Sequence, residues 1–186
     1  MQTTTLSLDN IHANGALFAN LLGARGAIQS NAAAQFDQYD TPASRWVTVH
    51  DGDRVMAAMR LTPTTHRCGV FSYRIRDAQR GLVDGIDSNP LFEDAPVADY
   101  VWECSRLFVA PDLTPAQTVR AWRHLATELM RAARAVGAST MIGMLTTDVV
   151  DRARRAGLDL AEAGPTVTVN GKSAVCVRAS MQAALH

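Results

Sequence analysis

The alternation of apolar and polar residues predicts two antiparallel hairpins. Arg45–His50 and Arg54–Leu61 have the pattern of strands, and the Asp-Gly-Asp segment between them is a strong turn signal. Near the C-terminus, Thr166–Val169 and Ser173–Ala179 are joined by an Asn-Gly pair. Asn-Gly is typical of a type I′ turn, whose twist matches that of the strands it joins. Each pair of segments is therefore expected to form neighbouring strands of a sheet.

A second period, close to that of the α-helix, predicts four helices. The longest begins at Thr114-Pro115, a favourable N-cap and first-turn pair, and stops before Gly137. Its expected apolar face consists of Val119, Trp122, Leu125, Leu129, Ala133 and Val136. The other expected elements are helices over Ile11–Ser30, Tyr73–Val83 and Asp148–Gly157 and strands over Tyr100–Val109 and Ser139–Leu145. This order predicts an α/β fold in which a mixed sheet carries helices on both faces.

Composition narrows the class of protein. The 186 residues suit one domain, residues 1–186, and the formal net charge of zero gives no sign of a nucleic-acid partner. No apolar run is long enough to span a membrane, and the first residues lack the basic and apolar regions of a signal peptide. Cys68, Cys104 and Cys176 are few and widely spaced, which favours a reducing cytoplasm. No Cys or His pair has zinc-ligand spacing, so no metal is expected.

Three segments place charged groups where chemistry is possible, and each also has a structural interpretation. Asp37 and Asp40 in FDQYD either cap a turn or hold a cationic ligand. Arg60 in RLTPTT either ends a strand before a turn or orients carboxylates from a rigid position. Glu103 and Arg106 interrupt the expected strand WECSRLFV, where they form either a structural ion pair or part of an active site. Their incomplete alternation also suggests a bulge.

Together these segments resemble the acyl-homoserine-lactone synthases of bacterial quorum sensing. The pattern of that family is E-x-D-x-x-D, then R-L-x-x-T, then W-E-x-S-R. FDQYD matches the D-x-x-D part of the first, and RLTPTT and WECSRLFV match the other two in the same order. The segment CGVFSYRIRDAQ, residues Cys68–Gln79, is similar to an alphaproteobacterial-type subgroup. Upstream, Arg25 matches the family's arginine, but Gln29 stands where the family has an aromatic residue. The resemblance implies a GNAT-like three-layer α/β/α sandwich with a mixed, mostly antiparallel sheet.

The resemblance also implies a reaction. The α-amine of S-adenosylmethionine attacks an acyl thioester, and the homoserine part then closes to a lactone and expels methylthioadenosine. Glu103 is expected to be the general base, with Asp40 and Arg106 as further catalytic residues. The residues implied in substrate binding are Arg25, Asp37, Asp40, Arg60, Phe71, Arg106, Phe108 and Thr146. No cofactor is expected, because S-adenosylmethionine is a substrate.

The acyl donor stays open between acyl-CoA and an acyl carrier protein. The segment before the long helix lacks the glycines of a pyrophosphate loop, which argues against an ordinary acetyl-CoA enzyme. Arg120, Arg123, Arg131 and Arg134 either form a basic patch for a carrier protein or are a solvated helix face. A monomer is favoured. Two rival interpretations are a generic GNAT N-acyltransferase and a degenerate, non-catalytic synthase homologue.

Overall fold

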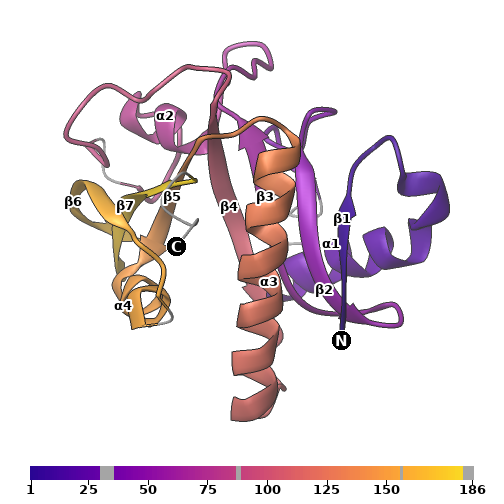
Figure 1. Cartoon of the computed structure of the whole chain (residues 1–186). Helices are drawn as coiled ribbons and strands as arrows, with labels where there is room; N and C mark the ends of the chain where they lie inside the picture. The colour runs from indigo at the N-terminus through magenta and orange to yellow at the C-terminus, as the bar shows by residue number, and fades with distance from the viewer. Residues whose placement is uncertain (30–35, 87–88, 156, 182–186) are drawn as a thin grey trace. The chain divides into compact units, whose positions relative to one another are not determined.

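The computed structural model describes residues 1–29, 36–86, 89–155 and 157–181. These residues form two compact units, each built on part of a mixed sheet (Figure 1). Unit 1 comprises Met1–Thr62 and Arg106–Ala135, and unit 2 comprises Pro63–Ser105 and Val136 onward. The strand order is β1-β2-β3-β4-β5-β7-β6, and β4 contributes residues to both units. Whether the chain acts as the single domain expected from its length stays a prediction.

The strands of unit 1 form an antiparallel meander. β1 (Gln2–Leu6) pairs with β2 (Arg45–Asp51), and β2 pairs with β3 (Arg54–Pro63) across the turn at Gly52. Gly52 has a φ of 57°, a left-handed conformation that glycine adopts at little cost. The first hairpin is therefore confirmed. β1 was not predicted, because its five residues include three threonines and give little hydrophobic signal.

Helices cover both faces of the unit 1 strands. The 3₁₀ turn η1 (Ile11–Ala13) precedes α1 (Gly15–Gln29), whose Leu17 and Phe18 pack with Leu6 of β1. α3 (Pro115–Ala135) packs on β1 and β2 from the other face, where Thr5 donates a hydrogen bond to Glu128 (Figure 1). Successive strand residues point to opposite faces, so the neighbours Thr5 and Leu6 meet different helices. This confirms helices on both faces.

The buried face of α3 matches the expected one only in part. Val119 is 53% exposed, whereas the buried positions are Ala121, Leu125, Glu128, Ala132 and Ala133. Leu125 and Ala133 are buried as expected, and Trp122 and Leu129 are half-buried. The apolar periodicity missed Glu128 because it excluded a charged residue. Glu128 is buried on that face because Thr5, Thr3 and Arg131 all donate hydrogen bonds to its carboxylate.

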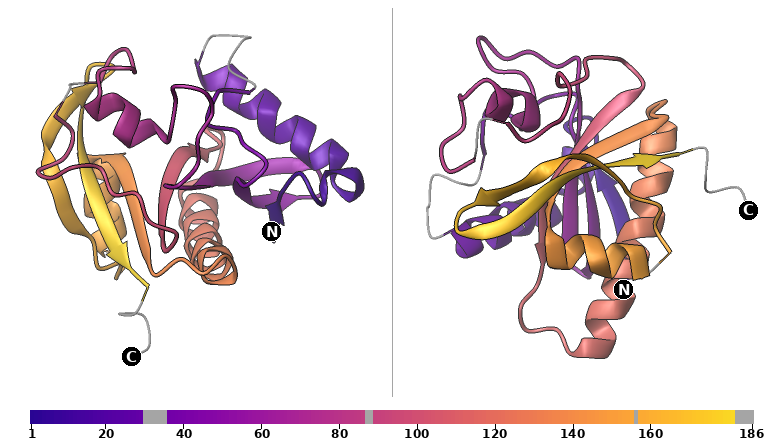
Figure 2. Two further views of the ribbon diagram at one scale, coloured as in Figure 1. Left: turned by 90° about the horizontal axis from the view of Figure 1, so that it is seen from above. Right: turned by 90° about the vertical axis from the view of Figure 1, so that its left-hand side faces the viewer.

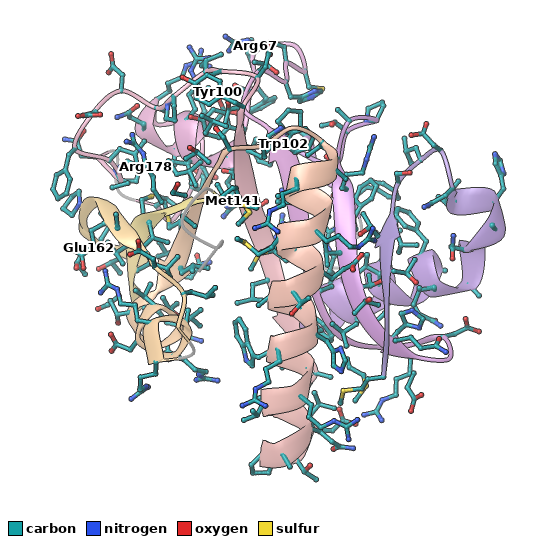
Figure 3. The ribbon with its side chains drawn as sticks, in the orientation of Figure 1. Arg67, Tyr100, Trp102, Met141, Glu162 and Arg178 are labelled. Atoms are coloured by element: carbon teal, nitrogen blue, oxygen red, sulfur yellow. The ribbon has the colours of Figure 1, made fainter. Side chains whose placement is uncertain are left out.

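The strands of unit 2 combine one parallel pair with antiparallel pairs (Figure 2). The first half of β4 (Val101–Val109) runs parallel to β5 (Thr140–Thr146), so that Trp102 lies opposite Met141 (Figure 3). β7 (Lys172–Ser180) pairs antiparallel with β5 and with β6 (Ala161–Val169). The turn between β6 and β7 contains Asn170 and Gly171, both with positive φ, which confirms the second hairpin.

Two short helices cover the unit 2 strands. α4 (Thr147–Arg155) buries Val150 against Val175 and Val177 of β7, while α2 (Arg74–Gln79) packs Ile75 in the cluster that contains Cys176. α2 is shorter than the expected Tyr73–Val83. Gly81 has a φ of 72° and Leu82 N donates to the Asp77 carbonyl, a pattern that ends a helix. Within the described ranges, no helix is long and apolar enough to cross a membrane.

Candidate active site

Asp37 and Asp40 shape a tight turn with their own carboxylates. Asp40 N donates to the Asp37 carbonyl at 2.9 Å, and Tyr39 N donates to Asp37 Oδ1 at 2.9 Å. In return, Asp37 N donates to Asp40 Oδ2 at 3.0 Å. The structural interpretation of this segment, aspartates that cap backbone amides, is thus present in the molecule. It fixes the direction of both carboxylates.

Three arginines from distant parts of unit 1 converge on these carboxylates. Arg25 of α1 binds Asp40 in a bidentate manner, with N···O distances of 3.1 and 2.9 Å. Arg60 of β3 reaches Asp37 at 2.7 Å and Asp40 at 2.9 Å through one nitrogen. Arg106 of β4 donates a hydrogen bond from Nε to Asp37 Oδ2 at 2.9 Å, and its terminal nitrogen also contacts that carboxylate. We call Arg25, Asp37, Asp40, Arg60 and Arg106 the Arg–Asp cluster.

The electrostatics of the Arg–Asp cluster keep both aspartates ionised. Burial alone would raise the pKa of Asp37, but the charges and hydrogen bonds of Arg60 and Arg106 lower it to about 2. Burial acts in the same way on Asp40, and hydrogen bonding to Arg25 and the charge of Arg60 lower its pKa. Three guanidinium groups therefore face two carboxylates, so the cluster carries a net positive charge. Such a site favours an anionic ligand group over a cationic one.

The backbone of β4 is distorted where Arg106 enters the cluster. Arg106 has a φ of 56°, a left-handed conformation that costs a non-glycine residue about 1 kcal/mol or more. The pairing of β4 with β5 covers Val101 to Cys104 only. The irregularity suggested by the strand's incomplete alternation is therefore present. The side chain at this position forms an ion pair with Asp37.

Glu103 occupies a different setting in unit 2. Its carboxylate is fully buried and accepts hydrogen bonds from Ile75 N at 2.7 Å and Arg74 N at 3.3 Å. These amides belong to the first turn of α2, where backbone N–H groups lack helical partners. Burial and the nearby Glu103 charge raise the pKa of Cys104 to about 12 and that of Cys176 to about 12. Both thiols are thus poor nucleophiles.

The other expected binding residues have mixed surroundings. Phe108 is 7% exposed and lies in the apolar cluster with Phe18 and Trp46, which is a core position. Phe71 is half-buried and its backbone pairs with Cys68. Thr146 is half-buried at the end of β5 and hydrogen-bonds to the side chain of Asp148, which lowers the pKa of Asp148. The side chain of Gln29 lies outside the described residues.

One residue of the site was not predicted. Trp46 of β2 is 2% exposed, and its Nε1 donates to Asp40 Oδ1 at 3.0 Å. In sequence it has the appearance of an ordinary core residue of a strand. Its position directly opposite Arg60 becomes visible only when the hairpin register is known.

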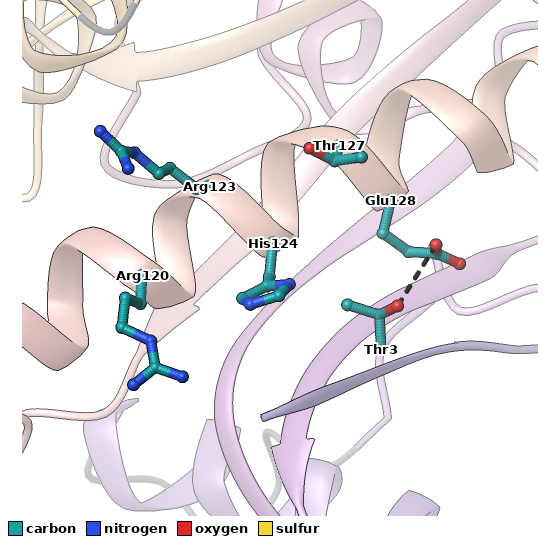
Figure 4. Close-up of a pocket in the computed structure, with 6 residues that line it drawn as sticks. All are labelled: Thr3, Arg120, Arg123, His124, Thr127 and Glu128. Carbon is teal, nitrogen blue, oxygen red and sulfur yellow. Dashed lines mark hydrogen bonds between the residues drawn. The ribbon is translucent and has the colours of Figure 1, made fainter.

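A groove on α3 shares no lining residue with the Arg–Asp cluster. It is lined by Thr3, Arg120, Arg123, His124, Thr127 and Glu128 (Figure 4). Arg120 and His124 lie one helical turn apart on one strip of α3, and Arg123 lies on the neighbouring strip. Glu128 at the end of the groove is already bound to Arg131. Within the described part of the chain, neither Arg120 nor Arg123 forms an ion pair, and no group of three His, Cys, Asp or Glu side chains could hold a metal.

Solved structures show where this fold occurs. TofI, in a ternary complex with an inhibitor and MTA, has a TM-score of 0.75 and 22% identity, covering 97% of this chain and 92% of TofI. BjaI, a CoA-dependent acyl-homoserine lactone synthase with SAM and isopentyl-CoA, has a TM-score of 0.73 and 17% identity, covering 95% and 82%. An acyl-CoA N-acyltransferase from Pseudomonas aeruginosa has a TM-score of 0.63 and 10% identity, covering 96% and 99%. The GNAT-like fold is therefore confirmed.

Sequence comparison decides the family. No family model matches the chain. An acyl-homoserine-lactone synthase of Acinetobacter nosocomialis is 31% identical over 146 residues, which cover 75% of this chain and 73% of that protein. Another from Pseudomonas aeruginosa is 26% identical over 144 residues, which cover 77% of this chain and 63% of that protein. With this identity over three quarters of its length, and with the three charged segments in the expected order, the chain belongs to the acyl-homoserine-lactone synthase family.

Proposed function

We propose that this enzyme makes an N-acyl-homoserine lactone from S-adenosylmethionine and an acyl thioester, and that it releases methylthioadenosine. The observation that carries the proposal is the Arg–Asp cluster, because it holds four charged positions of the family's segments and the upstream Arg25 in one ordered network. A degenerate homologue would have little reason to keep three buried or half-buried arginines bound to two aspartates, since unpaired buried charges are costly.

Arg106 is the residue we assign to the substrate carboxylate. Its side chain is 16% exposed, the highest value in the cluster, whereas that of Arg60 is completely buried. Arg60 and Arg25 each form ion pairs with both Asp37 and Asp40. The surplus positive charge of the cluster suits the carboxylate of S-adenosylmethionine, and the planar guanidinium of Arg106 suits bidentate recognition. Asp37 positions Arg106 for this contact.

Glu103 is the residue we assign to deprotonation. The α-amine of S-adenosylmethionine is an ammonium group when free, and it has no lone pair until a proton leaves. Glu103 is a buried carboxylate fixed by two backbone amides, so it can accept that proton through a water molecule. Asp40 keeps a lowered pKa and accepts five hydrogen bonds from four residues, so its part in this proposal is to hold Arg25 and Arg60 in place.

The two bond-forming steps need different help. In the first, the neutral amine attacks the thioester carbonyl, the carbon–nitrogen bond forms and the thiolate leaves with the proton that the amine gives up. In the second, a carboxylate oxygen of the homoserine part attacks Cγ, and the carbon–sulfur bond to the sulfonium breaks. Because a sulfonium is a good leaving group, lactone closure depends mainly on holding the carboxylate near Cγ. Arg106 would provide that orientation.

The acyl donor is the finer part of the proposal. BjaI is a CoA-dependent synthase with isopentyl-CoA, which supports acyl-CoA. The cationic groove of Arg120, Arg123 and His124 instead supports an acyl carrier protein, because such a partner is acidic. Replacing Arg120 and Arg123 by alanine should lower kcat/KM with an acyl carrier protein, more strongly at low salt, and leave acyl-CoA turnover unchanged. Arg54→Ala, which changes another exposed arginine, is the control.

The remaining parts of the proposal concern the setting of the enzyme. We include a cytoplasmic location, supported by three cysteines that are free in the described residues. We also include a monomer that needs no bound cofactor. Size-exclusion chromatography with light scattering tests whether the protein is a monomer. The activity of protein purified in the presence of a chelator tests whether it needs a bound cofactor.

Release of methylthioadenosine tests the reaction itself. Purified protein is incubated with S-adenosylmethionine and a series of acyl-CoA and acyl carrier protein thioesters, and the products are followed by liquid chromatography. Wild-type protein should release methylthioadenosine only when a donor is present. Glu103→Gln should lower kcat by roughly 10²-fold or more, while Glu162→Gln, at a half-exposed position of the same unit, should not. Acylation of another amine without methylthioadenosine would indicate a generic N-acyltransferase and overturn the proposal.

A further inference from the structure

We infer that Trp46 is a positioning residue of the enzyme, which fixes the Asp40 carboxylate and fastens α1 to it. The inference rests on the proposed function, and it adds a residue outside the charged segments that define the family resemblance. In this inference Trp46 makes no direct contact with the substrate. Its proposed action passes through the Arg–Asp cluster.

The hairpin register brings Trp46 to Asp40. Trp46 on β2 and Arg60 on β3 are direct cross-strand partners, so their side chains lie on the same face of the sheet. Both then donate to the same atom, Asp40 Oδ1, at 3.0 Å from Trp46 Nε1 and 2.9 Å from Arg60. The indole N–H therefore completes the set of donors around this oxygen, together with Arg25 at 3.1 Å. With these donors in place, the carboxylate plane has little freedom to rotate.

The rest of the Trp46 ring holds the helix that carries Arg25. Its indole meets the ring of Phe18 edge-on, with centroids 5.1 Å apart and planes at 80°, and Leu17 and Leu21 belong to the same apolar cluster. These residues lie on α1 one to two turns before Arg25. One side chain thus binds the anion and packs against the element that supplies one of its cations. If the indole N–H is lost, both the carboxylate and the bidentate Arg25 contact lose a constraint.

A merely structural tryptophan would behave differently. A buried tryptophan normally finds a partner for its N–H, but here the partner is a charged carboxylate of the cluster and not a backbone carbonyl. Trp122 on α3 provides the matched comparison in the same unit. Its Nε1 is buried and has no hydrogen-bond partner among the described residues, so Trp122→Phe removes a similar volume and no hydrogen bond.

The test is a mutant cycle on methylthioadenosine release. Trp46→Phe should lower kcat/KM by roughly tenfold or more while the protein stays folded, since a hydrogen bond to a charged group is lost. In the Asp40→Asn background, Trp46→Phe should lower kcat/KM much less than it does in wild-type protein, because both changes act through one carboxylate. Trp122→Phe should leave kcat/KM within about twofold of wild type and should be additive with Asp40→Asn. Full additivity of Trp46→Phe with Asp40→Asn would overturn the inference.

Two further measurements separate this inference from other failures. If Trp46→Phe does not fold, the sulfur analogue benzothienylalanine at position 46 keeps the two-ring shape and removes only the N–H, and the same loss of activity is expected. In ¹⁵N-tryptophan-labelled protein, the Trp46 indole proton should exchange slowly and shift in Asp40→Asn. A wild-type enzyme that releases no methylthioadenosine contradicts the proposed function, whereas a fast-exchanging Trp46 indole proton contradicts the link to Asp40.

Discussion

Single residues in this protein serve the local backbone and the charged cluster at once. The Asp37 carboxylate accepts a hydrogen bond from the Tyr39 amide and also binds Arg60 and Arg106. The same carboxylate therefore stabilises a turn and links β3 to β4. The expected turn-capping role of this segment is therefore present, and its carboxylates bind arginines of the chain itself. The coexistence of these contacts is physically sensible, because each carboxylate oxygen has two lone pairs and can accept more than one donor.

The low pKa of Asp37 makes stability depend on pH in a defined window. A carboxylate whose pKa falls from 3.8 to about 2 on folding stabilises the folded state above pH 4, and this contribution disappears as the pH falls toward 2. We expect Asp37→Asn to cost about 2 kcal/mol at pH 6, and the difference from wild type to shrink at pH 3. Urea unfolding at the two pH values measures it. Asp9→Asn, at an exposed position, should show no such trend.

Arg106 should separate substrate binding from folding. Arg106→Lys keeps the charge but loses the bidentate fork, so KM for S-adenosylmethionine should rise roughly tenfold or more, with little change in KM for the acyl donor. Steady-state kinetics with each substrate varied in turn provides the measurement. Arg131→Lys, which changes an exposed arginine bound to Glu128, is the control. An equal rise in both KM values would argue against a contact between Arg106 and the substrate carboxylate.

At the scale of elements, sequence patterns predicted what local chemistry determines. The two hairpins follow from their turn residues, and α3 follows from its caps, so both were found. β1 was missed because edge strands are short and polar, and its place beside β2 depends on contacts distant in sequence. Trp46 was missed for a different reason. Its partner Asp40 is close in sequence, but the hydrogen bond requires the hairpin and the turn to be placed together.

The buried Glu128 should fasten β1 to α3. Its carboxylate accepts hydrogen bonds from Thr5 at 2.8 Å and from Thr3 at 3.4 Å. We expect Glu128→Ala to destabilise the protein by about 1–3 kcal/mol and to speed amide exchange in β1 more than in β3. Hydrogen exchange followed by mass spectrometry measures the exchange rates of both strands. Asp148→Ala removes a carboxylate from an exposed ion pair and should leave exchange in β1 unchanged.

The backbone of Pro90 lies so close to Gly164 of β6 that no side chain fits at position 164. A Cβ at this position would lie 1.9 Å from the Pro90 carbonyl oxygen, where only backbone atoms could move away. Gly164→Ala should therefore lower stability by about 2 kcal/mol or more. Gly23 on α1 has open space around it, so Gly23→Ala should be neutral or stabilise by up to about 1 kcal/mol. Thermal unfolding of both variants decides whether this contrast holds.

For the whole molecule, family membership and the Arg–Asp cluster support the same chemistry. The family follows from 31% identity over three quarters of the chain, whereas the cluster follows from the geometry of unit 1. Sequence alone predicted the α/β fold and the five charged positions of the cluster. It did not predict which arginine binds which aspartate, because those pairings depend on strand register and on the backbone distortion at Arg106.

Tracing the origin of the lactone in a bacterial host that has no synthase of its own tests the proposed reaction most directly. The host expresses this chain and is fed methionine labelled in its backbone carbons. We predict an N-acyl-homoserine lactone whose ring carries the label, methylthioadenosine without it, and loss of the lactone in Glu103→Gln. Soluble, folded wild-type protein that yields no labelled lactone with any acyl donor supply would contradict the account.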